Sequence, residues 1–348
     1  MKTNKVITES LFKLLFLLGI TSPANTNAEL FTILTFHRIL PDKFRKDYPL
    51  PWLVTTPREL HLILYHLKKY YELGTVSGIL KKWRRNKESN KPLLAITFDD
   101  GHEDNYTYAA PVLEGLGLNA TFYIPAGIVE ERGTLWDELL GFTSFRLYQK
   151  KIEFCCVNKF FDTNILKYSS PVDAASNIIN MCKSLPNKDR VELINRCADR
   201  SYIPNWSKMM SWEQISKLAK NGHEIGSHSM THSILINCSD RELHSEIFES
   251  RELIQSKIKS HVFTFCYPSG TYDNRILEYT EKAGYKCAVT TECRSNKKKD
   301  ALFSLGRCDI NSQKLLNHCG KFSSYRLSWR LSGINRVICQ VASVVSHK

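Results

Sequence analysis

The sequence lacks the cysteine pairs that mark zinc ribbons and thioredoxin-like redox sites. Its 348 residues include eleven cysteines, an odd number, and no two of them form a Cys-x-x-Cys pair. Apart from the neighbours Cys155 and Cys156, the cysteines are scattered singly along the chain. Unpaired thiols are typical of proteins kept in a reducing compartment, so this usage indicates a cytoplasmic location.

The sequence also has no hydrophobic run long enough to cross a bilayer. The apolar stretch near the N-terminus covers residues 11–20, whereas a membrane-spanning helix needs about 20 apolar residues. Two interpretations of the segment 1–30 stay open. It is an amphipathic helix that packs on the domain or lies on a membrane surface, or it is a signal peptide that is cleaved near Ala28 and exports the chain. Glu9 and Lys13, which interrupt the apolar pattern, favour the amphipathic helix.

The sequence has fewer acidic than basic residues, but the basic residues are not clustered in one segment. Lysine and arginine outnumber aspartate and glutamate by 48 to 35, which gives a formal net charge of +13. The basic residues are dispersed and do not alternate with aromatic residues at a regular spacing, which argues against a nucleic-acid-binding protein. A basic surface facing anionic lipid headgroups or an acidic glycan fits better, and a merely solvated basic surface is the simplest alternative.

What the sequence does contain is an apolar run that ends in two carboxylates. Residues 93–104 read LLAITFDDGHED, and the continuous hydrophobicity predicts a parallel strand covered on both faces. Gly101 permits a sharp exit from the strand. Since consecutive residues at a strand end project to opposite sides, one of Asp99 and Asp100 can bind a metal while the other accepts a proton. Taken alone, Asp-Gly is also a common solvated turn.

Two histidines four residues apart follow a second strand-like run. Residues 226–232 read GSHSMTH, and the spacing brings His228 and His232 onto one side of a helix or turn. Two imidazoles and one carboxylate form a three-ligand site with open positions for a catalytic metal. No glutamate follows His228, so the zincin motif is absent and the base must come from elsewhere, for which Asp99 is available. A His-x-x-x-His pair by itself can also be incidental.

Together these motifs resemble the polysaccharide deacetylase family, whose catalytic region is the NodB homology domain of the carbohydrate esterase family 4 type. The resemblance implies a deformed (β/α) barrel and metal-dependent removal of N-acetyl groups from a glycan. It also implies that Asp99 is the base and that Asp100, His228 and His232 are the metal ligands. The matching segments are ILTFHRILPD, TFDDGHEDN, ATFYIPAG, SWEQISKLAKNGHEIGSHSMTHS, FTFCYPSGTYDN and LGRCDI.

Alternating strands and capped helices independently predict an α/β fold with a parallel sheet or barrel. Between about residues 130 and 210 the alternation breaks into charged, helix-forming segments, which indicates a helical insertion. We therefore expect an N-terminal segment 1–30, a catalytic domain 31–310 and a basic C-terminal extension 311–348. The polar run 81–91 is expected to be a solvated loop.

Three further residues are candidates for the catalytic machinery. The backbone N–H of Tyr267 is a candidate donor to the developing oxyanion. His318, in Leu-Asn-His, resembles the family's late Leu-x-His motif and is the candidate general acid. The family's usual arginine before the proline of the third motif is absent from FCYPSG, a departure that resembles the subgroup acting on exopolysaccharide or lipid-linked precursors. Arg307 is the candidate replacement that holds Asp99, and a surface arginine is the alternative.

Trp136 and His37 are candidates for contact with substrate. Trp136 matches a pattern in related deacetylases and begins the insertion, although a packing role is the plainer interpretation. His37 follows the first predicted strand and lines the mouth of the site, unless it is a strand-end histidine bonded to the backbone.

The sequence therefore predicts a metal-dependent hydrolase that removes N-acetyl groups from an amino-sugar glycan or a lipid-linked glycan precursor. We expect one divalent metal ion, zinc in the first place, no nucleic acid, and peripheral contact with a membrane. The alternatives are a glycan-binding protein of the same fold without turnover, and a nonhaem iron oxygenase, which the spare Asp99 disfavours.

Overall fold

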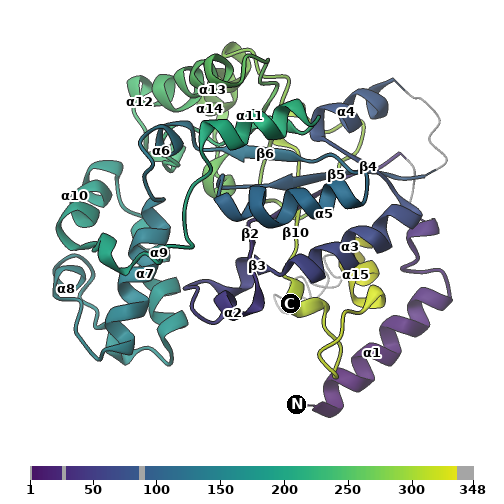
Figure 1. The fold of residues 1–348 in the computed structure, drawn as a ribbon, viewed down its shortest axis with the longest axis horizontal. Helices are drawn as coiled ribbons and strands as arrows, with labels where there is room; N and C mark the ends of the chain where they lie inside the picture. Colours follow the sequence, from purple (N-terminus) through teal and green to yellow (C-terminus); the bar gives the residue numbers. More distant parts are fainter. Residues whose placement is uncertain (1, 26–28, 86–90, 335–348) are drawn as a thin grey trace, which may run out of the picture.

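The computed structural model describes residues 2–25, 29–85 and 91–334. Its centre is an eight-stranded sheet in the order β10-β1-β5-β6-β7-β8-β9, with β4 beside β5, and helices cover its outer face (Figure 1). The strands of this sheet are β1 (Phe31–Phe36), β4 (Glu72–Gly74), β5 (Leu93–Phe98), β6 (Thr121–Ile124), β7 (Glu224–Ser227), β8 (Thr264–Cys266), β9 (Cys287–Val289) and β10 (Cys308–Asp309). A separate pair joins β2 (Arg38–Ile39) to β3 (Val54–Thr55).

Fifteen α-helices lie in the described part of the chain. They are α1 (Lys2–Leu17), α2 (Asp42–Arg45), α3 (Pro57–Tyr70), α4 (Val76–Arg84), α5 (Ala110–Gly115), α6 (Ala126–Glu130), α7 (Trp136–Gln149), α8 (Cys155–Phe161), α9 (Pro171–Lys183), α10 (Asn187–Cys197), α11 (Trp212–Lys220), α12 (Asp240–His244), α13 (Ser250–Ile258), α14 (Asn274–Lys282) and α15 (Ser324–Leu331). None of them combines the length and the apolarity needed to cross a membrane.

The sheet curls because β10, its last strand in the sequence, pairs with β1, its first. Leu305 forms a parallel bridge to Val289 at the end of β9, and Cys308 of β10 pairs with Leu34 of β1. The short segment between these contacts therefore lies between the two edges of the sheet. This parallel, partly closed arrangement confirms the predicted deformed (β/α) barrel.

The longest strand pairing in the sheet joins β1 to β5 at the centre of the barrel. Six residue pairs run in register from Phe31 opposite Leu93 to Phe36 opposite Phe98, and both strands are buried along their whole length. Their continuous hydrophobicity fits strands covered on both faces. Because the strands are parallel, the residues after Phe36 and Phe98 emerge at the same rim, where barrel enzymes keep their chemistry.

The predicted solvated loop at residues 81–91 is partly wrong. Its first four residues end helix α4, which begins after the capping residue Thr75. Val76, Ile79 and Trp83 face the core at helical spacing, and Trp83 is only 3% exposed. Its indole N–H donates to the carbonyl of Glu29. The lysines and arginines on the outer face of α4 concealed this apolar stripe.

The helices α7 to α10 form the insertion between β6 and β7. They share a small core of their own, and Figure 1 shows them gathered at one side of the barrel. Leu140 of α7, Ile178 of α9 and Leu193 of α10 are fully buried in that core. The domain boundaries at residues 30 and 310 remain predictions, and the cleavage near Ala28 lies outside the described residues.

Glu59 links three parts of the fold around helix α3. Its carboxylate accepts hydrogen bonds from the Thr56 N–H at 2.8 Å, from Ser312 Oγ at 2.9 Å and from the guanidinium of Arg45. Burial would raise the pKa of Glu59, but the hydrogen bonds from Arg45, Thr56 and Ser312 hold it below its ordinary value. A carboxylate with a depressed folded-state pKa adds stability that is present above its unfolded pKa and is lost as pH falls.

We therefore expect Glu59→Gln to lower the free energy of unfolding at neutral pH by about 1–2 kcal/mol. The loss should shrink as pH falls, because the wild-type carboxylate becomes protonated and loses its advantage. Urea unfolding at several pH values measures both effects. Glu278→Gln, whose carboxylate pairs with the exposed Lys282, is the control. An equal loss at every pH would contradict the account.

Candidate metal centre and catalytic site

The motifs singled out in the sequence meet at one cavity on the barrel rim. The cavity encloses about 480 Å³ and lies at the carboxyl ends of β5, β7 and β8. Asp99, Asp100, His228, His232 and Arg307 line it together. Residues separated by up to 208 positions are thus brought together by parallel strands that end at the same level.

Asp99 is clamped by a buried guanidinium. Arg307 Nη1 lies 2.8 Å from Asp99 Oδ1 and Nη2 lies 2.8 Å from Oδ2, a bidentate pair. Both residues are 2% exposed. Burial alone would raise the pKa of Asp99, but the charge and hydrogen bonds of Arg307 lower it. The predicted contact between Arg307 and Asp99 is therefore present, and the alternative of a surface arginine is excluded.

Asp100 faces the two histidines instead. Its Oδ1 lies 3.4 Å from His228 Nε2 and 3.6 Å from His232 Nε2, and the candidate ligand atoms of the three residues all lie within 4.8 Å of one another. Asp100 adopts a left-handed backbone with φ of 73°. This conformation, rather than the simple strand alternation that we expected, turns Asp100 away from Asp99. The two histidines are buried and the Asp100 side chain is 13% exposed, and the three residues are able to hold a divalent metal.

A hydrogen bond to the protein fixes the orientation of the His228 imidazole, whereas His232 is held through its backbone. His228 Nδ1 lies 2.8 Å from the carbonyl oxygen of Cys266, which turns Nε2 toward Asp100. The backbone N–H of His232 donates to Ser229 Oγ at 3.0 Å, and its backbone carbonyl accepts from Trp136 Nε1 at 3.0 Å. The ring Nδ1 of His232 has no hydrogen-bond partner among the described residues. The ring contact of His228 is of the kind that metal-ligating histidines make. The two histidines follow β7 on a loop with positive φ at Ser229 and His232, so no helix holds the pair.

Asp99, His228 and Cys266 form a second set of potential ligands, whose ligand atoms also lie within 4.8 Å of one another. It is a poor cation site for two reasons. Both oxygens of Asp99 already accept from Arg307, whose Nη2 also lies 3.1 Å from Cys266 Sγ. Burial also raises the pKa of the Cys266 thiol, so the thiolate that a metal requires is disfavoured. The set with Asp100 is therefore the better candidate.

The prediction for Tyr267 is wrong. Its backbone N–H donates to the carbonyl of Val289 at 3.2 Å, because the ladder between β8 and β9 continues one residue beyond β8. Its hydroxyl donates to the carbonyl of Phe303 at 3.0 Å. Tyr267 borders the cavity but has no free N–H for an oxyanion. Ser269, two residues further along, also lines the cavity.

The prediction for His318 is also wrong. The chain leaves the rim after β10, and His318 lies exposed in a turn closed by the bridge between Leu316 and Phe322. His318 is not among the described residues that line the cavity. His37, which belongs to neither set of potential ligands, also lies beside Asp99. Its Nε2 is 3.9 Å from Asp99 Oδ2, and its Nδ1 is 3.8 Å from Asp309 Oδ1.

Trp136 has a packing role rather than the predicted contact with substrate. It is 8% exposed, and the guanidinium of Arg190 lies 4.9 Å from its ring centre. Its neighbour Asp137 lines the cavity instead, with Oδ1 4.0 Å from His232 Nδ1. The insertion thus approaches the histidine loop through Trp136 and Asp137.

A buried arginine joins the insertion to the barrel. Arg38, which is fully buried, donates from Nε to Asp104 Oδ2 at 2.7 Å and from Nη1 to Ser207 Oγ at 2.8 Å. The same guanidinium pairs with Glu138 of α7. These contacts hold the start of α7 against the rim, so that Asp137 faces the cavity.

One face of α9 forms a wall of the cavity that also contains Asp99 and Asp100, and sequence reasoning missed it. Ser176, Ile179, Asn180 and Lys183 line the cavity at helical spacing, and Trp52 adds an indole at the rim. Hydrophobic periodicity identifies an amphipathic helix, but it does not show which distant strand end the polar face will meet.

The comparisons with known proteins agree with this arrangement. A sequence model described as polysaccharide deacetylase matches residues 86–288, more than half of the chain. The chain belongs to the polysaccharide deacetylase family. It is 23% identical to YxkH of Bacillus subtilis over 253 residues, which cover 73% of this chain and 63% of that protein. It is 29% identical to a peptidoglycan-N-acetylglucosamine deacetylase of Bacillus cereus over 75 residues, or 22% of this chain and 35% of that protein.

The match to each of these relatives thus spans less than two thirds of its length. Among solved structures, the Streptococcus pyogenes deacetylase PplD in complex with acetate is similar in fold, with a TM-score of 0.55 and 16% identity. The similarity covers 82% of this chain and 94% of PplD.

The contact between Arg307 and Asp99 predicts a specific pattern of stability. Arg307→Met should destabilise the metal-free protein by about 3–5 kcal/mol at neutral pH, because it leaves Asp99 buried without its counter-charge. The double variant Arg307→Met/Asp99→Leu should be more stable than Arg307→Met alone, since it removes the stranded charge. Urea unfolding at fixed pH measures both variants. A loss below about 1 kcal/mol for the single variant would show that the pair is not electrostatically coupled.

Proposed function

We propose that the chain is a metal-dependent hydrolase that removes N-acetyl groups from an amino-sugar-containing glycan. The observation that supports this most strongly is that the adjacent carboxylates of Asp99 and Asp100 have different partners. Asp100 shares a ligand set with His228 and His232, whereas Asp99 is held apart by Arg307. Membership of the deacetylase family and the likeness to deacetylase folds support the same activity.

The donor set fits one divalent transition metal, with zinc as our first choice. Two imidazole nitrogens and one carboxylate oxygen leave open positions, as in catalytic zinc sites. A cation bound there would polarise the acetamide carbonyl and acidify a water molecule. Asp100, His228 and His232 would be the protein ligands. The burial of both imidazoles, the hydrogen bond that orients His228 and the left-handed turn at Asp100 are features of this chain that support such binding.

Asp99 serves as the general base in this proposal. A carboxylate offers about four lone-pair sites, and Arg307 uses two of them, so Asp99 can still accept a proton from the attacking water. The clamp prevents rotation of the carboxylate and keeps it ionised inside the protein. His37 protonates the leaving amine, because it is the cavity histidine that belongs to neither ligand set; the carboxylate of Asp309 lies 3.8 Å from its other ring nitrogen.

The glycan binds between the rim and the insertion. Trp52 offers an aromatic face of the kind that packs on sugar rings, and Asn180 and Lys183 of α9 supply polar groups on the facing wall. We infer either a polymer or a lipid-linked precursor as substrate. A glycan-binding protein without turnover is the alternative.

Alanine and amide variants separate the roles of the two carboxylates. Asp99→Asn should keep its metal and slow acetate release by at least ~10²-fold, the usual scale of a general base. Asp100→Ala should lose both metal and activity. Metal content after dialysis and acetate release from a panel of N-acetylated glycans are the measurements. Loss of metal in Asp99→Asn with retention in Asp100→Ala would reverse the assignment, and a metal-loaded wild type that releases no acetate would favour the glycan-binding alternative.

The assignment of the general acid has a matched pair of variants. His37→Gln should lower kcat by about 10²-fold without loss of metal, because only amine departure lacks its proton donor. His318→Ala should have wild-type kcat, since His318 is exposed outside the cavity. Both rates come from the same acetate-release assay. Wild-type turnover in His37→Gln, or a defect confined to His318→Ala, would assign the acid elsewhere.

A further inference from the structure

Helix α1 is fastened to the domain by one face. Phe12 stacks on Trp329 of α15 with ring centres 4.9 Å apart, and Phe16 meets Tyr325 edge to face at 5.3 Å. Glu9 Oε2 lies 2.6 Å from Arg326 Nε, so the acidic side chain of this face is paired. These contacts fix which side of α1 faces outward.

The outward side of α1 and of the turn after it is apolar. Six of the eleven exposed large hydrophobic residues in the described chain lie here. Those within the helix form a stripe along one side of it, about 15 Å long from Ile7 to Leu17 at 1.5 Å per residue. A stripe of this size is unusual on a surface that meets only water. The six residues are Ile7, Leu11, Leu14, Leu17, Leu18 and Ile20, which are 63%, 49%, 53%, 67%, 65% and 55% exposed.

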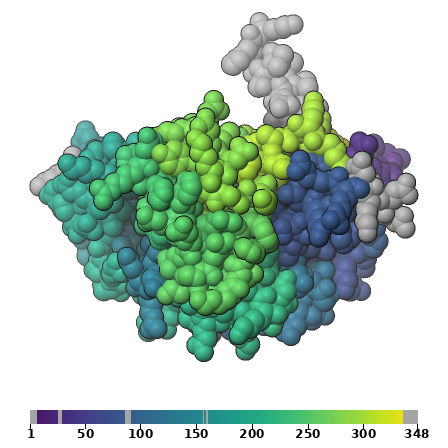
Figure 2. Space-filling model, turned by 90° about the horizontal axis from the view of Figure 1, so that it is seen from above, coloured from purple at the N-terminus to yellow at the C-terminus, as the bar shows by residue number. Residues whose placement is uncertain are grey.

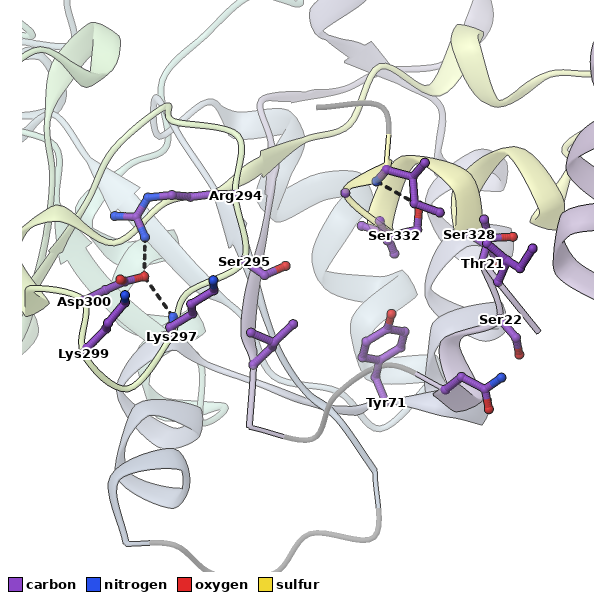
Figure 3. A pocket seen from close by; sticks show the side chains of 16 residues that line it. Thr21, Ser22, Tyr71, Arg294, Ser295, Lys297, Lys299, Asp300, Ser328 and Ser332 are labelled. Atoms are coloured by element: carbon purple, nitrogen blue, oxygen red, sulfur yellow. Dashed lines mark hydrogen bonds and ion pairs between the residues drawn. The ribbon is translucent and has the colours of Figure 1, made fainter. Parts of the chain in front are cut away.

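A cavity of about 660 Å³ adjoins the end of this stripe (Figure 3). Exposed Lys297 and Lys299 border it on one side, and Asp300 beside them is neutralised by Arg294 at 2.6 Å. On the opposite side it is lined by Thr21 and Ser328. These two hydroxyls are buried, at 3% and 1% exposure, and have no hydrogen-bond partner among the described residues.

We propose that the apolar stripe of α1, together with this lysine-bordered cavity, docks on an anionic lipid bilayer. The stripe enters the boundary between headgroups and acyl chains, as interfacial amphipathic helices do. Lys13, Lys297 and Lys299 face the negatively charged headgroups, and the unpartnered hydroxyls of the cavity donate to headgroup phosphate oxygens. This surface is independent of the proposed hydrolysis.

Charge favours a bilayer over a second copy of the chain as the occupant. A copy would bring a second set of the same lysines to the contact and add to a net charge that is already +13. A bilayer with anionic headgroups reverses that sign and attracts each lysine by about 1 kcal/mol.

The docking surface lies at the opposite end of the barrel from the catalytic cavity. Leu30, which lines the lysine-bordered cavity, directly precedes β1, whereas Asp99 and His37 lie at the carboxyl ends of their strands. Figures 1 and 2 both show α1 at the far end of the molecule from the insertion helices. A docked molecule would therefore hold the cavity that contains Asp99 and Asp100 away from the membrane.

Vesicle co-sedimentation of the full chain, with any tag at the C-terminus, tests the proposal. Wild type should bind phosphatidylcholine vesicles that contain phosphatidylglycerol at least tenfold more than vesicles of phosphatidylcholine alone, and high salt should weaken that binding. Leu14→Ser/Leu18→Ser and Lys297→Glu/Lys299→Glu should each lose binding about tenfold or more. Ile152→Ser/Val191→Ser, at similarly exposed positions on the insertion, should bind as wild type.

Four results would overturn the proposal. They are no binding by wild type, wild-type binding by Leu14→Ser/Leu18→Ser, an equal loss in Ile152→Ser/Val191→Ser, and a mature chain in cells that begins near residue 29. Analytical ultracentrifugation tests the second-copy alternative, because a wild-type dimer that Leu14→Ser/Leu18→Ser abolishes would assign the stripe to self-association. Thermal unfolding verifies that each variant folds.

Discussion

The rim of this barrel depends on one buried guanidinium. Arg307 lies in the segment that joins the two edges of the sheet, and it binds groups from several strand ends at once. Besides Asp99, it donates to Thr97 Oγ1 at 3.2 Å and to the carbonyl of Thr290 at 2.8 Å. A buried ion pair is a weak source of net stability, because desolvation offsets most of its Coulombic gain. Its consequence is positional: Asp99 stays ionised and turned away from Asp100, which leaves Asp100 to the histidines.

The insertion completes the site by a second buried arginine. Arg38 ties α7 to the rim through Glu138, and the adjacent Asp137 and Trp136 reach the loop that carries His232. The same insertion brings the polar face of α9 over the cavity. In the proposed function, the barrel thus supplies the reacting groups, while the insertion supplies the wall that a glycan would meet. Substrate choice should therefore vary with the insertion more than with the barrel.

The sequence was most informative where a local pattern determines the outcome. Continuous apolar runs predicted the parallel strands, and shared strand ends predicted that Asp99, Asp100 and the histidine pair would meet. The contact of Arg307 with Asp99 followed from the need for a counter-charge. Prediction failed where a group's fate depends on a distant neighbour. The backbone N–H of Tyr267 donates to the carbonyl of Val289, so it is not free for an oxyanion. His318 lies exposed and away from the cavity, because the chain leaves the rim after β10. The position of α9 over the cavity could not be predicted from the sequence, because tertiary contacts determine how an insertion is oriented.

The central claim is that one cation binds Asp100, His228 and His232 while Asp99 stays bound to Arg307. Anomalous diffraction at the zinc edge from crystals of the zinc-loaded protein tests it most directly. The account predicts one peak about 2.0–2.2 Å from an oxygen of Asp100 and from Nε2 of both histidines, with Asp99 outside the coordination sphere. A peak bonded to Asp99 and Cys266, or displacement of Arg307 from Asp99 by the metal, would contradict it.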